Sequence, residues 1–513
     1  MKYDAVLLGA SVGSMSAAIS LAEKGLKPII IEKSSLVGGG TAYSGGLVWA
    51  PNNHRMRAKG IVDSEQEAMA YLRAISQNRW DPAVALAYVR ELPRVLQSLE
   101  HATSLRWVTY TGLPDYYSDL PGGKENGRFL LPLGAELSNE LENALPDRTE
   151  MGLVRRALHV PGAESDWTWG RALVGALWAR VLELGVAYRL NHRATCLVNK
   201  QDGLTGVEVL APSGTITVQS RLGVLLNTGG FEWNRAMTEQ FMGPPLLHPQ
   251  TPPSNEGDGH AMAARLGADM QLMDLTIGIP AVLIPGSEND GQNLYRVFFQ
   301  PLCLPHSLVV NRSGHRFANE TFFIDMAKAW EQTDSTNVRA NFPAFLIFDG
   351  QYRKRYGLPP GLQTGVTISE HPTLSALALH HGIDGAALND EVAQFNRVAL
   401  AGGKDRFGRG ASSYQRAFGD AGNHPNPTLG PIDTPPFFAV ELHPSTAGHR
   451  GGARIDAHAR VLDRQGDWVP GLYACGNSAA GSVTGANYIS GATIGHALVF
   501  GTLAAEDMAS RAA

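Results

Sequence analysis

Residues 3–32 read YDAVLLGASVGSMSAAISLAEKGLKPIIIE, and this stretch decides the fold class. Two apolar runs, 3–8 and 27–32, have the length and composition of buried β-strands. The segment between them opens with small residues and then places apolar side chains at helical spacing, from Met15 to Ala22. This order predicts a βαβ unit with two parallel strands and a right-handed helical crossover. We therefore expect an α/β fold.

The turn between the first strand and the helix has the composition of a dinucleotide-binding turn. Gly9, Ser11, Gly13 and Ser14 are all small, although Ser11 and Ser14 stand where glycine is usual. Small side chains let the backbone approach a pyrophosphate, and the amides at the helix N-terminus face an anion. Glu32 ends the second strand, where a carboxylate can accept hydrogen bonds from ribose hydroxyls; the alternative is a solvated strand end. The pattern favours a nucleotide cofactor.

The composition of the chain excludes several classes of protein. It has 513 residues, of which 44% are hydrophobic and 18% charged, as in folded globular proteins. A net charge of −5 predicts no binding to nucleic acid or to an anionic membrane. No apolar run reaches the roughly eighteen residues of a transmembrane segment. The cysteines Cys196, Cys303 and Cys475 are far apart and form no CxxC, which favours a reducing, cytoplasmic location.

The rest of the chain suggests one nucleotide-binding domain with an insertion. Residues 66–100 predict helix, and 193–228 predict strands separated by turns. From 271 to 435 the pattern changes to short strands, proline loops and helices, which we interpret as an inserted α+β cap domain. Residues 1–270 and 436–513 would then form the nucleotide-binding domain. The sequence contains one nucleotide turn, so an external electron acceptor is expected rather than a second nucleotide in the same chain.

Motifs spread over nearly the whole chain carry a family resemblance. They are the turn GxSxGS, Glu32-Lys33, the loop GGGTAYSGG, Pro51-Asn52-Asn53, Asp115-Tyr116-Tyr117, Arg316-Phe317 with Asn319-Glu320, Gly476-Asn477 and the segment GATIG at 491–495. In this order they resemble the FAD-dependent 3-ketosteroid dehydrogenases, within the fumarate reductase and succinate dehydrogenase flavoprotein class. The resemblance implies a Rossmann-like FAD-binding domain.

The resemblance also implies which residues bind FAD. They are Gly9, Ser11, Gly13, Ser14, Glu32, Lys33, Gly39, Gly40, Thr41, Ser44, Gly45, Gly46, Ala194, Gly229, Gly230, Asp258, Gly476, Asn477, Ala492 and Ile494. A helix starting near Gly491 would direct its positive end at the pyrimidine end of the flavin and stabilise the reduced, anionic form.

Two positions separate this chain from the fumarate-type members of the class. Their arginines bind the carboxylates of a dicarboxylate substrate, and the corresponding residues here are Tyr488 and Ile324. Tyr488 and the backbone amide of Gly491 match instead the pair that holds a ketone oxygen in ketosteroid desaturases, although a packing role for Tyr488 is the alternative. The resemblance thus implies desaturation of a small apolar ketone, either a 3-ketosteroid or a cyclohexanone-type ring.

The general base is open at this point, because Ile324 stands where the family has a tyrosine. Tyr116 could serve through a relay or could simply pack under the cap, and Ser490 and Tyr117 are weaker candidates. His443 and His449 have no third ligand in sight, so no metal site is expected. Two other functions compete: an ene-reductase acting on an enone or unsaturated acid, and a flavin electron-transfer protein without turnover.

Overall fold

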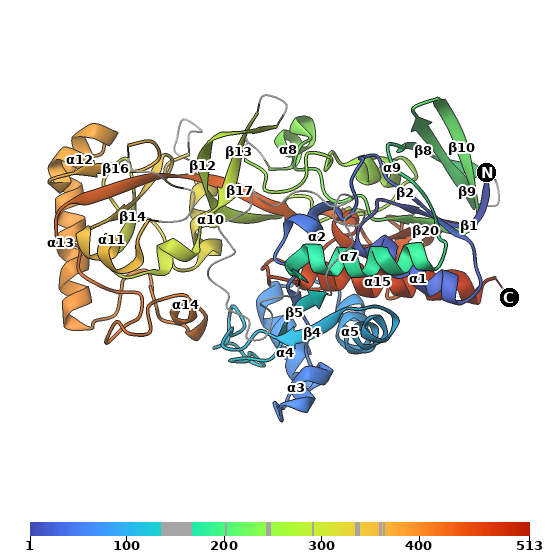
Figure 1. Ribbon diagram of the computed structural model, residues 1–513, viewed down its shortest axis with the longest axis horizontal. Coiled ribbons are helices and arrows are strands. Elements are labelled where there is room, and N and C mark those ends of the chain that lie inside the picture. Colours follow the sequence, from blue (N-terminus) through green and yellow to red (C-terminus); the bar gives the residue numbers. More distant parts are fainter. Residues whose placement is uncertain are drawn as a thin grey trace.

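The computed structural model describes most of the chain. The described residues are 1–134, 167–200, 203–242, 248–289, 292–333, 339–358, 362 and 365–512. Figure 1 shows an elongated molecule with one sheet toward each end, and both chain termini lie at the same end.

The predicted βαβ unit is confirmed. It consists of β1 (Lys2–Leu8), α1 (Val12–Glu23) and β2 (Pro28–Ile31). The two strands are parallel, with Val6 opposite Ile29. All four residues of β2 are buried, as expected for a strand covered by helices on both faces.

The βαβ unit belongs to an eight-stranded sheet that unites distant parts of the chain. Its order is β19-β20-β10-β1-β2-β7, and β9 continues from β10 to β8. The further strands are β7 (Ala187–Arg189), β8 (Arg193–Lys200), β9 (Gly203–Ala211), β10 (Gly214–Leu226), β19 (Arg460–Leu462) and β20 (Trp468–Ala474). The prediction of strands within 193–228 is thus confirmed. Asp202, in the turn predicted between the first two of these strands, lies outside the described residues. Because β20 pairs with β10, the C-terminal segment completes the N-terminal sheet.

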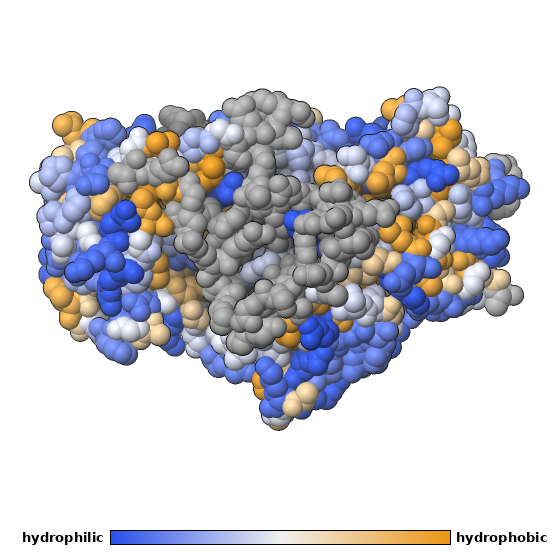
Figure 2. All heavy atoms as spheres, in the orientation of Figure 1, coloured by the Kyte–Doolittle hydropathy of each residue, from blue (hydrophilic) through white to orange (hydrophobic). Residues whose placement is uncertain are grey.

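Helices cover this sheet. α1 packs against α15 (Ala492–Ser510) and α7 (Trp169–Glu183). The segment predicted as helical at 66–100 forms two helices, α4 (Glu65–Ser76) and α5 (Pro82–Ala102), because Gln77 and Asn78 adopt positive φ and Asp81 caps a new helix. Hydrophilic side chains gather on the surface around α5, at the bottom of the view (Figure 2).

A second sheet of six strands forms the other end of the molecule. Its order is β13-β12-β17-β15-β14, and β16 pairs with β17. The strands are β12 (Thr276–Asn289), β13 (Gln292–Val297), β14 (Ser307–Asn311), β15 (Ala344–Phe348), β16 (Ser369–His371) and β17 (Phe437–His449). Alternate residues of β15 enter two separate hydrophobic cores, one with α10 (Phe323–Glu331) and α11 (Gly350–Tyr356), the other with α12 (Leu374–His381) and α13 (Gly385–Ala401).

The division of the chain at 271 and 435 stays a prediction. One strand bears on it: β17, which the division assigns to the nucleotide-binding domain, hydrogen-bonds to β12 and β15 in the second sheet. This strand runs from the far end of the molecule to its centre (Figure 1). Its pairing thus places it in the second sheet.

Smaller elements complete the fold. They are α2 (Gly39–Tyr43), β3 (Val48–Trp49), α3 (His54–Ala58), β4 (Arg106–Thr109), β5 (Phe129–Gly134), β6 (Trp167–Thr168), α8 (Arg235–Met242), α9 (Asp258–Arg265), β11 (Met270–Gln271), η2 (Gln300–Cys303), α14 (Ser413–Ala417), β18 (Gly452–Ala453) and η3 (Gly476–Ser478). None of the helices in the described part of the chain combines the length and apolar character that a membrane crossing requires.

Candidate active site

A large cavity lies where the parallel strands of the first sheet end. Leu8, Ile31 and Asn227, which end or directly follow β1, β2 and β10, line it. Its empty space is about 1290 Å³, open solvent included. Ligands of open α/β sheets bind at this carboxyl edge of the strands. The edge is therefore the expected position of a nucleotide cofactor.

Most of the predicted cofactor residues line this cavity. They are Gly9, Ser11, Glu32, Lys33, Gly39, Gly40, Thr41, Ser44, Gly45, Gly46, Ala194, Gly229, Asp258, Gly476, Asn477 and Ile494. Ala492 instead lines a smaller cavity beside it, which shares Tyr488 and Asn477 with the large one. Gly13, Ser14 and Gly230 line neither of the two.

Gly13 and Ser14 lie at the buried start of α1. A side chain on Gly13 would clash with the Sγ atom of Cys475. With its amide oxygen turned toward the helix, Asn227 accepts hydrogen bonds from the backbone N–H groups of Ser14 (2.9 Å) and Gly13 (3.2 Å). These two residues therefore position the helix N-terminus, while Gly9 and Ser11 face the cavity.

Glu32 is held by the backbone at the cavity wall. Its Oε2 atom accepts a hydrogen bond from the Ala10 N–H and its Oε1 atom accepts one from the Ser34 N–H, both at 2.8 Å. Burial raises the pKa of this carboxyl group. Each carboxylate oxygen has lone pairs beyond these bonds, so Glu32 has the chemistry to accept ribose hydroxyls.

A cluster of four charges borders the cavity beside Glu32. Lys33 pairs with Glu256 (2.7 Å) and with Asp258 (2.8 Å), and Arg193 pairs with Asp258 at 2.6 Å. The predicted residues Lys33 and Asp258 thus contact each other as well as lining the cavity.

The start of α15 forms another wall of the cavity. Its N-cap, Gly491, has φ +84°, a left-handed conformation that favours glycine, and a side chain there would overlap the Leu47 backbone. Thr493 and Ile494 of the first helical turn line the cavity. The positive end of a 19-residue helix therefore faces the cavity.

Three of the four predicted catalytic residues, Tyr488, Ser490 and Gly491, line the same cavity. The fourth, Tyr116, lies behind them, and its ring meets that of Tyr488 edge-on at 6.3 Å. Burial raises the pKa of both phenols, and the neighbouring Ser490 partly offsets the rise in each. The Gly491 amide also partly offsets the rise in the pKa of Tyr488, so the two predicted donors lie close together on the wall.

Sequence reasoning missed Tyr414, on α14. Its ring centroid lies 4.2 Å from that of Tyr116, and each phenol affects the pKa of the other. Burial raises the pKa of Tyr414 well above its ordinary value. No motif marks this residue, because nearly 300 residues of chain separate it from Tyr116 and only the packing of the two parts brings them together.

The position of Ile324 is apolar in the structure as well. Ile324 is buried in α10, directly after Phe322 and Phe323, whose rings pack on Tyr116 at 6.3 and 5.7 Å. Tyr117 packs on Phe322, and its buried hydroxyl has no hydrogen-bond partner within the described residues. Burial raises the pKa of Tyr117.

A second residue that sequence reasoning missed is Arg450, which is 5% exposed. Its guanidinium donates to the Ala486 carbonyl (3.0 Å), to the Thr484 hydroxyl (2.8 Å) and to the Gly485 carbonyl. No carboxylate of the described residues lies within ion-pair distance. Burial lowers the pKa of Arg450 to about 10. Arg450 and Tyr488 line the smaller cavity together, so an uncompensated positive charge lies beside the predicted ketone site.

The two histidines considered for a metal lie in different surroundings. His449 stacks on Phe231 at 3.8 Å and its Nδ1 atom lies 3.2 Å from Glu232. His443 packs beside Tyr295 at 4.9 Å. The prediction that these two residues bind no metal stays a prediction.

The fold and the cavity define a nucleotide-binding flavoprotein of the oxidoreductase class. Residues 4–494 match the FAD binding domain family, and the chain belongs to this family. FAD as the cofactor, predicted from the motifs, is thereby confirmed.

Individual relatives agree with the resemblance seen in the motifs. The chain is 34% identical to a 4-oxocyclohexanecarboxylate 2-dehydrogenase of Sinomonas cyclohexanicum, over 100% of this chain and 93% of the relative. It is 32% identical to a 3-oxosteroid 1-dehydrogenase of Mycobacterium tuberculosis, over 100% and 99% of the two chains. The crystal structure of a 3-ketosteroid delta1-dehydrogenase from Sterolibacterium denitrificans, in complex with 1,4-androstadiene-3,17-dione, matches with a TM-score of 0.89 at 30% identity, covering 99% of this chain and 100% of that one.

The cavity fits FAD on grounds of its own chemistry. Its wall offers glycine backbone for close approach, a backbone-bonded carboxylate at Glu32 and two helix N-termini, those of α1 and α15. These are the groups that bind ribose and pyrophosphate and that stabilise negative charge on a ring system.

Proposed function

We propose that this protein is an FAD-dependent dehydrogenase that introduces a double bond beside the carbonyl of a cyclic ketone. The observation that carries the proposal is the position of the Tyr488 phenol beside the Gly491 amide on the wall of the FAD cavity. Two donors that converge on one point can hold a single carbonyl oxygen. The residues that bind dicarboxylates in fumarate-type members are replaced here by Tyr488 and Ile324.

The donors would act by polarising the ketone. Hydrogen bonds from Tyr488 and Gly491 to the carbonyl oxygen stabilise the enolate that forms when the α carbon loses a proton, and each such donor is typically worth ~10²–10³ in rate. FAD bound in the cavity would supply the acceptor for the hydride from the β carbon.

The α proton needs a path, since Ile324 cannot take it. Ser490 lines the cavity beside Tyr116, whose ring centroid lies 4.2 Å from that of Tyr414. Buried phenols with raised pKa values are protonated at neutral pH, so each can accept a proton only while passing its own on. We therefore assign a proton relay to the chain Ser490–Tyr116–Tyr414, in which a water molecule or buffer base takes up the proton that Tyr414 releases.

The substrate ring and the redox partner are finer parts of the proposal. The relatives act on a 4-oxocyclohexanecarboxylate or on 3-oxosteroids, so both ring types are substrates to test. A separate electron acceptor would reoxidise the flavin, as expected for a chain with one nucleotide turn. The three free thiols, two of them buried, favour a reducing, cytoplasmic location.

Replacing Tyr488 tests the function directly. Tyr488→Phe removes one donor and should lower turnover ~10²–10³-fold while FAD stays bound. Turnover is measured by anaerobic bleaching of the flavin with 3-ketosteroids and with cyclohexanone-type ketones. Tyr188→Phe, on the partly exposed strand β7, is the matched control and should retain full activity.

Three outcomes would contradict the proposal. Unchanged turnover in Tyr488→Phe would remove the ketone-binding pair. Reduction of an enone by the dye-reduced enzyme, with no bleaching by any saturated ketone, would identify an ene-reductase. Absence of any substrate-dependent change in flavin absorbance would identify an electron-transfer protein.

A further inference from the structure

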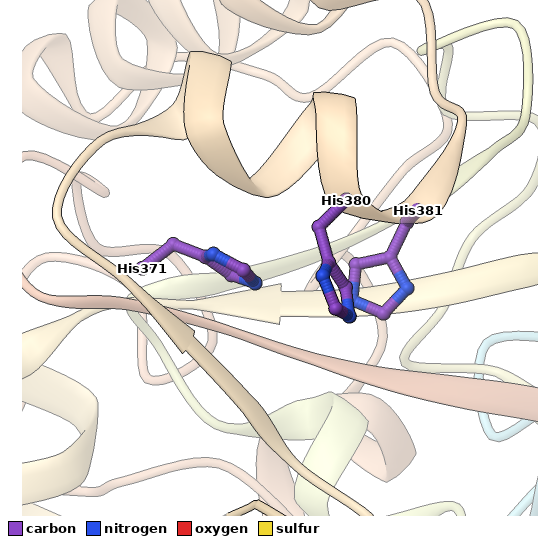
Figure 3. Close-up of side chains that lie close together, drawn as sticks. All are labelled: His371, His380 and His381. Atoms are coloured by element: carbon purple, nitrogen blue, oxygen red, sulfur yellow. The ribbon is translucent and has the colours of Figure 1, made fainter.

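Three histidines gather in the second sheet, away from the FAD cavity. His371 ends β16, and His380 and His381 end α12. One potential ligand atom from each lies within 4.8 Å of those of the other two. Figure 3 shows His371 extending from its strand toward the two histidines at the end of the helix. Helix α12 lies at the opposite end of the molecule from α1 (Figure 1).

The local chain path explains why the three side chains meet. β16 pairs with β17, with His371 opposite Phe437. Thr373 then caps α12 through its hydroxyl, which accepts a hydrogen bond from the Ala376 N–H at 3.1 Å. The helix folds back along the strand, so that His381 Nε2 lies 2.6 Å from the Ser369 hydroxyl. A short strand–helix hairpin thus supplies all three imidazoles.

The surroundings of His371, His380 and His381 suit a bound metal ion better than three positively charged imidazoles. None of the three forms an ion pair with a carboxylate of the described residues. The Nε2 atom of His371 is buried and has no hydrogen-bond partner there. If the Nε2–H group of His381 donates to Ser369, its Nδ1 atom is left with the free lone pair. Metal-binding histidines are usually oriented by such a second hydrogen bond.

The three histidines also line one cavity. Glu370, Glu441 and His443 line the same cavity as the three histidines. The two carboxyl groups add negative potential without a fourth ligand in the cluster.

We propose that His371, His380 and His381 bind one divalent transition-metal ion, with Zn²⁺ as the probe. Imidazole ligands suit Zn²⁺, Cu²⁺ and Ni²⁺, and three protein ligands leave a position for water. Because the ion would connect the end of β16 to the end of α12, its role is to hold this hairpin together. It takes no part in the flavin chemistry.

Untagged holoprotein, stripped of metals with a chelator, provides the test. Isothermal titration with Zn²⁺ should give one ion per chain, and Zn²⁺ should raise the melting temperature. His371→Ala and His381→Ala should each weaken Zn²⁺ binding at least tenfold and abolish the thermal shift. His458→Ala, an exposed histidine on a turn beside β19, is the matched control and should behave as wild type.

Two further readouts keep the result unambiguous. Bound FAD and ketone-dependent bleaching in the two triad variants should match wild type, which shows that they are folded. The proposal is overturned if wild type binds no Zn²⁺, or if His371→Ala binds it as tightly as wild type does. Neither result bears on the ketone dehydrogenase activity.

Discussion

At the scale of single residues, the site depends on side chains that no motif marks. Tyr414 and Arg450 both lie next to predicted residues, one behind Tyr116 and the other behind Tyr488. Tyr414 is the last member of the proposed proton path, and Arg450 adds a buried positive charge beside Tyr488.

Tyr414→Phe tests the proton path. Loss of the last phenol should lower kcat ~10²–10⁴-fold, the usual contribution of a proton-transfer group, while the ketone still binds. Rapid-mixing measurement of flavin reduction separates binding from chemistry. Tyr356→Phe is the control, because its phenol bonds to Asp420 away from the site. Normal flavin reduction in Tyr414→Phe would mean that the proton path does not include Tyr414.

Arg450→Met tests the buried charge. Burial raises the pKa of the Tyr488 phenol, and the Arg450 guanidinium partly offsets that rise by favouring the ionised form. Without it, the phenol becomes a weaker acid and a weaker donor to the enolate, so turnover should fall roughly tenfold to a hundredfold. The basic limb of the pH–rate profile should move to higher pH.

Charge-conserving and distant variants separate this effect from misfolding. Arg450→Lys retains the charge and should recover part of the rate, whereas Arg235→Met, at an exposed site on α8, should have no effect. Equal losses in Arg450→Lys and Arg450→Met, with an unshifted pH profile, would mean that Arg450 only supports the backbone of 484–486.

At the scale of elements, the close contact between α1 and α15 positions the FAD cavity. Both helices begin at the cavity, and their N-termini are its positive walls. Gly501 of α15 faces Gly13 of α1 so closely that a side chain would overlap the Gly13 carbonyl oxygen. The two glycines thereby set the distance between the helices.

Gly501→Ala should push these helices apart. Overpacking of this kind typically costs ~1–3 kcal/mol, and we expect a lower denaturation midpoint together with weaker FAD retention. Both can be followed by urea titration and by flavin release on gel filtration. Gly385→Ala, in the first turn of α13 where a methyl group finds space, is the control. Wild-type stability of Gly501→Ala would show that the helix contact is adaptable.

The elements were largely predictable where the chain is locally regular. The βαβ unit at 3–32 and the strands within 193–228 follow from apolar periodicity, which depends on neighbouring residues alone. The break at Gln77 and Asn78 was not predicted, although Asp81 followed by Pro82 is a helix-start signal in the sequence.

At the scale of the whole molecule, the cavity is assembled from both ends of the chain. β1 and β2 supply one part of the wall, and the segment from Gly476 to Ala497 supplies another through β20 and α15. β17 belongs to the second sheet and runs from the far end of the molecule to its centre (Figure 1). The aromatic residues of α10 and α14 thereby meet Tyr116 beside the flavin site.

The amino-acid sequence by itself determined the fold class through short-range apolar spacing, and its family resemblance identified the cofactor, while the two donors at 488 and 491 stay a prediction. Only the tertiary structure decided that Tyr414 packs on Tyr116, that Arg450 lies beside Tyr488 with no carboxylate partner among the described residues, and that three histidines lie close together. Such contacts depend on how helices and sheets pack, and packing is set by all the buried surfaces together rather than by any one segment.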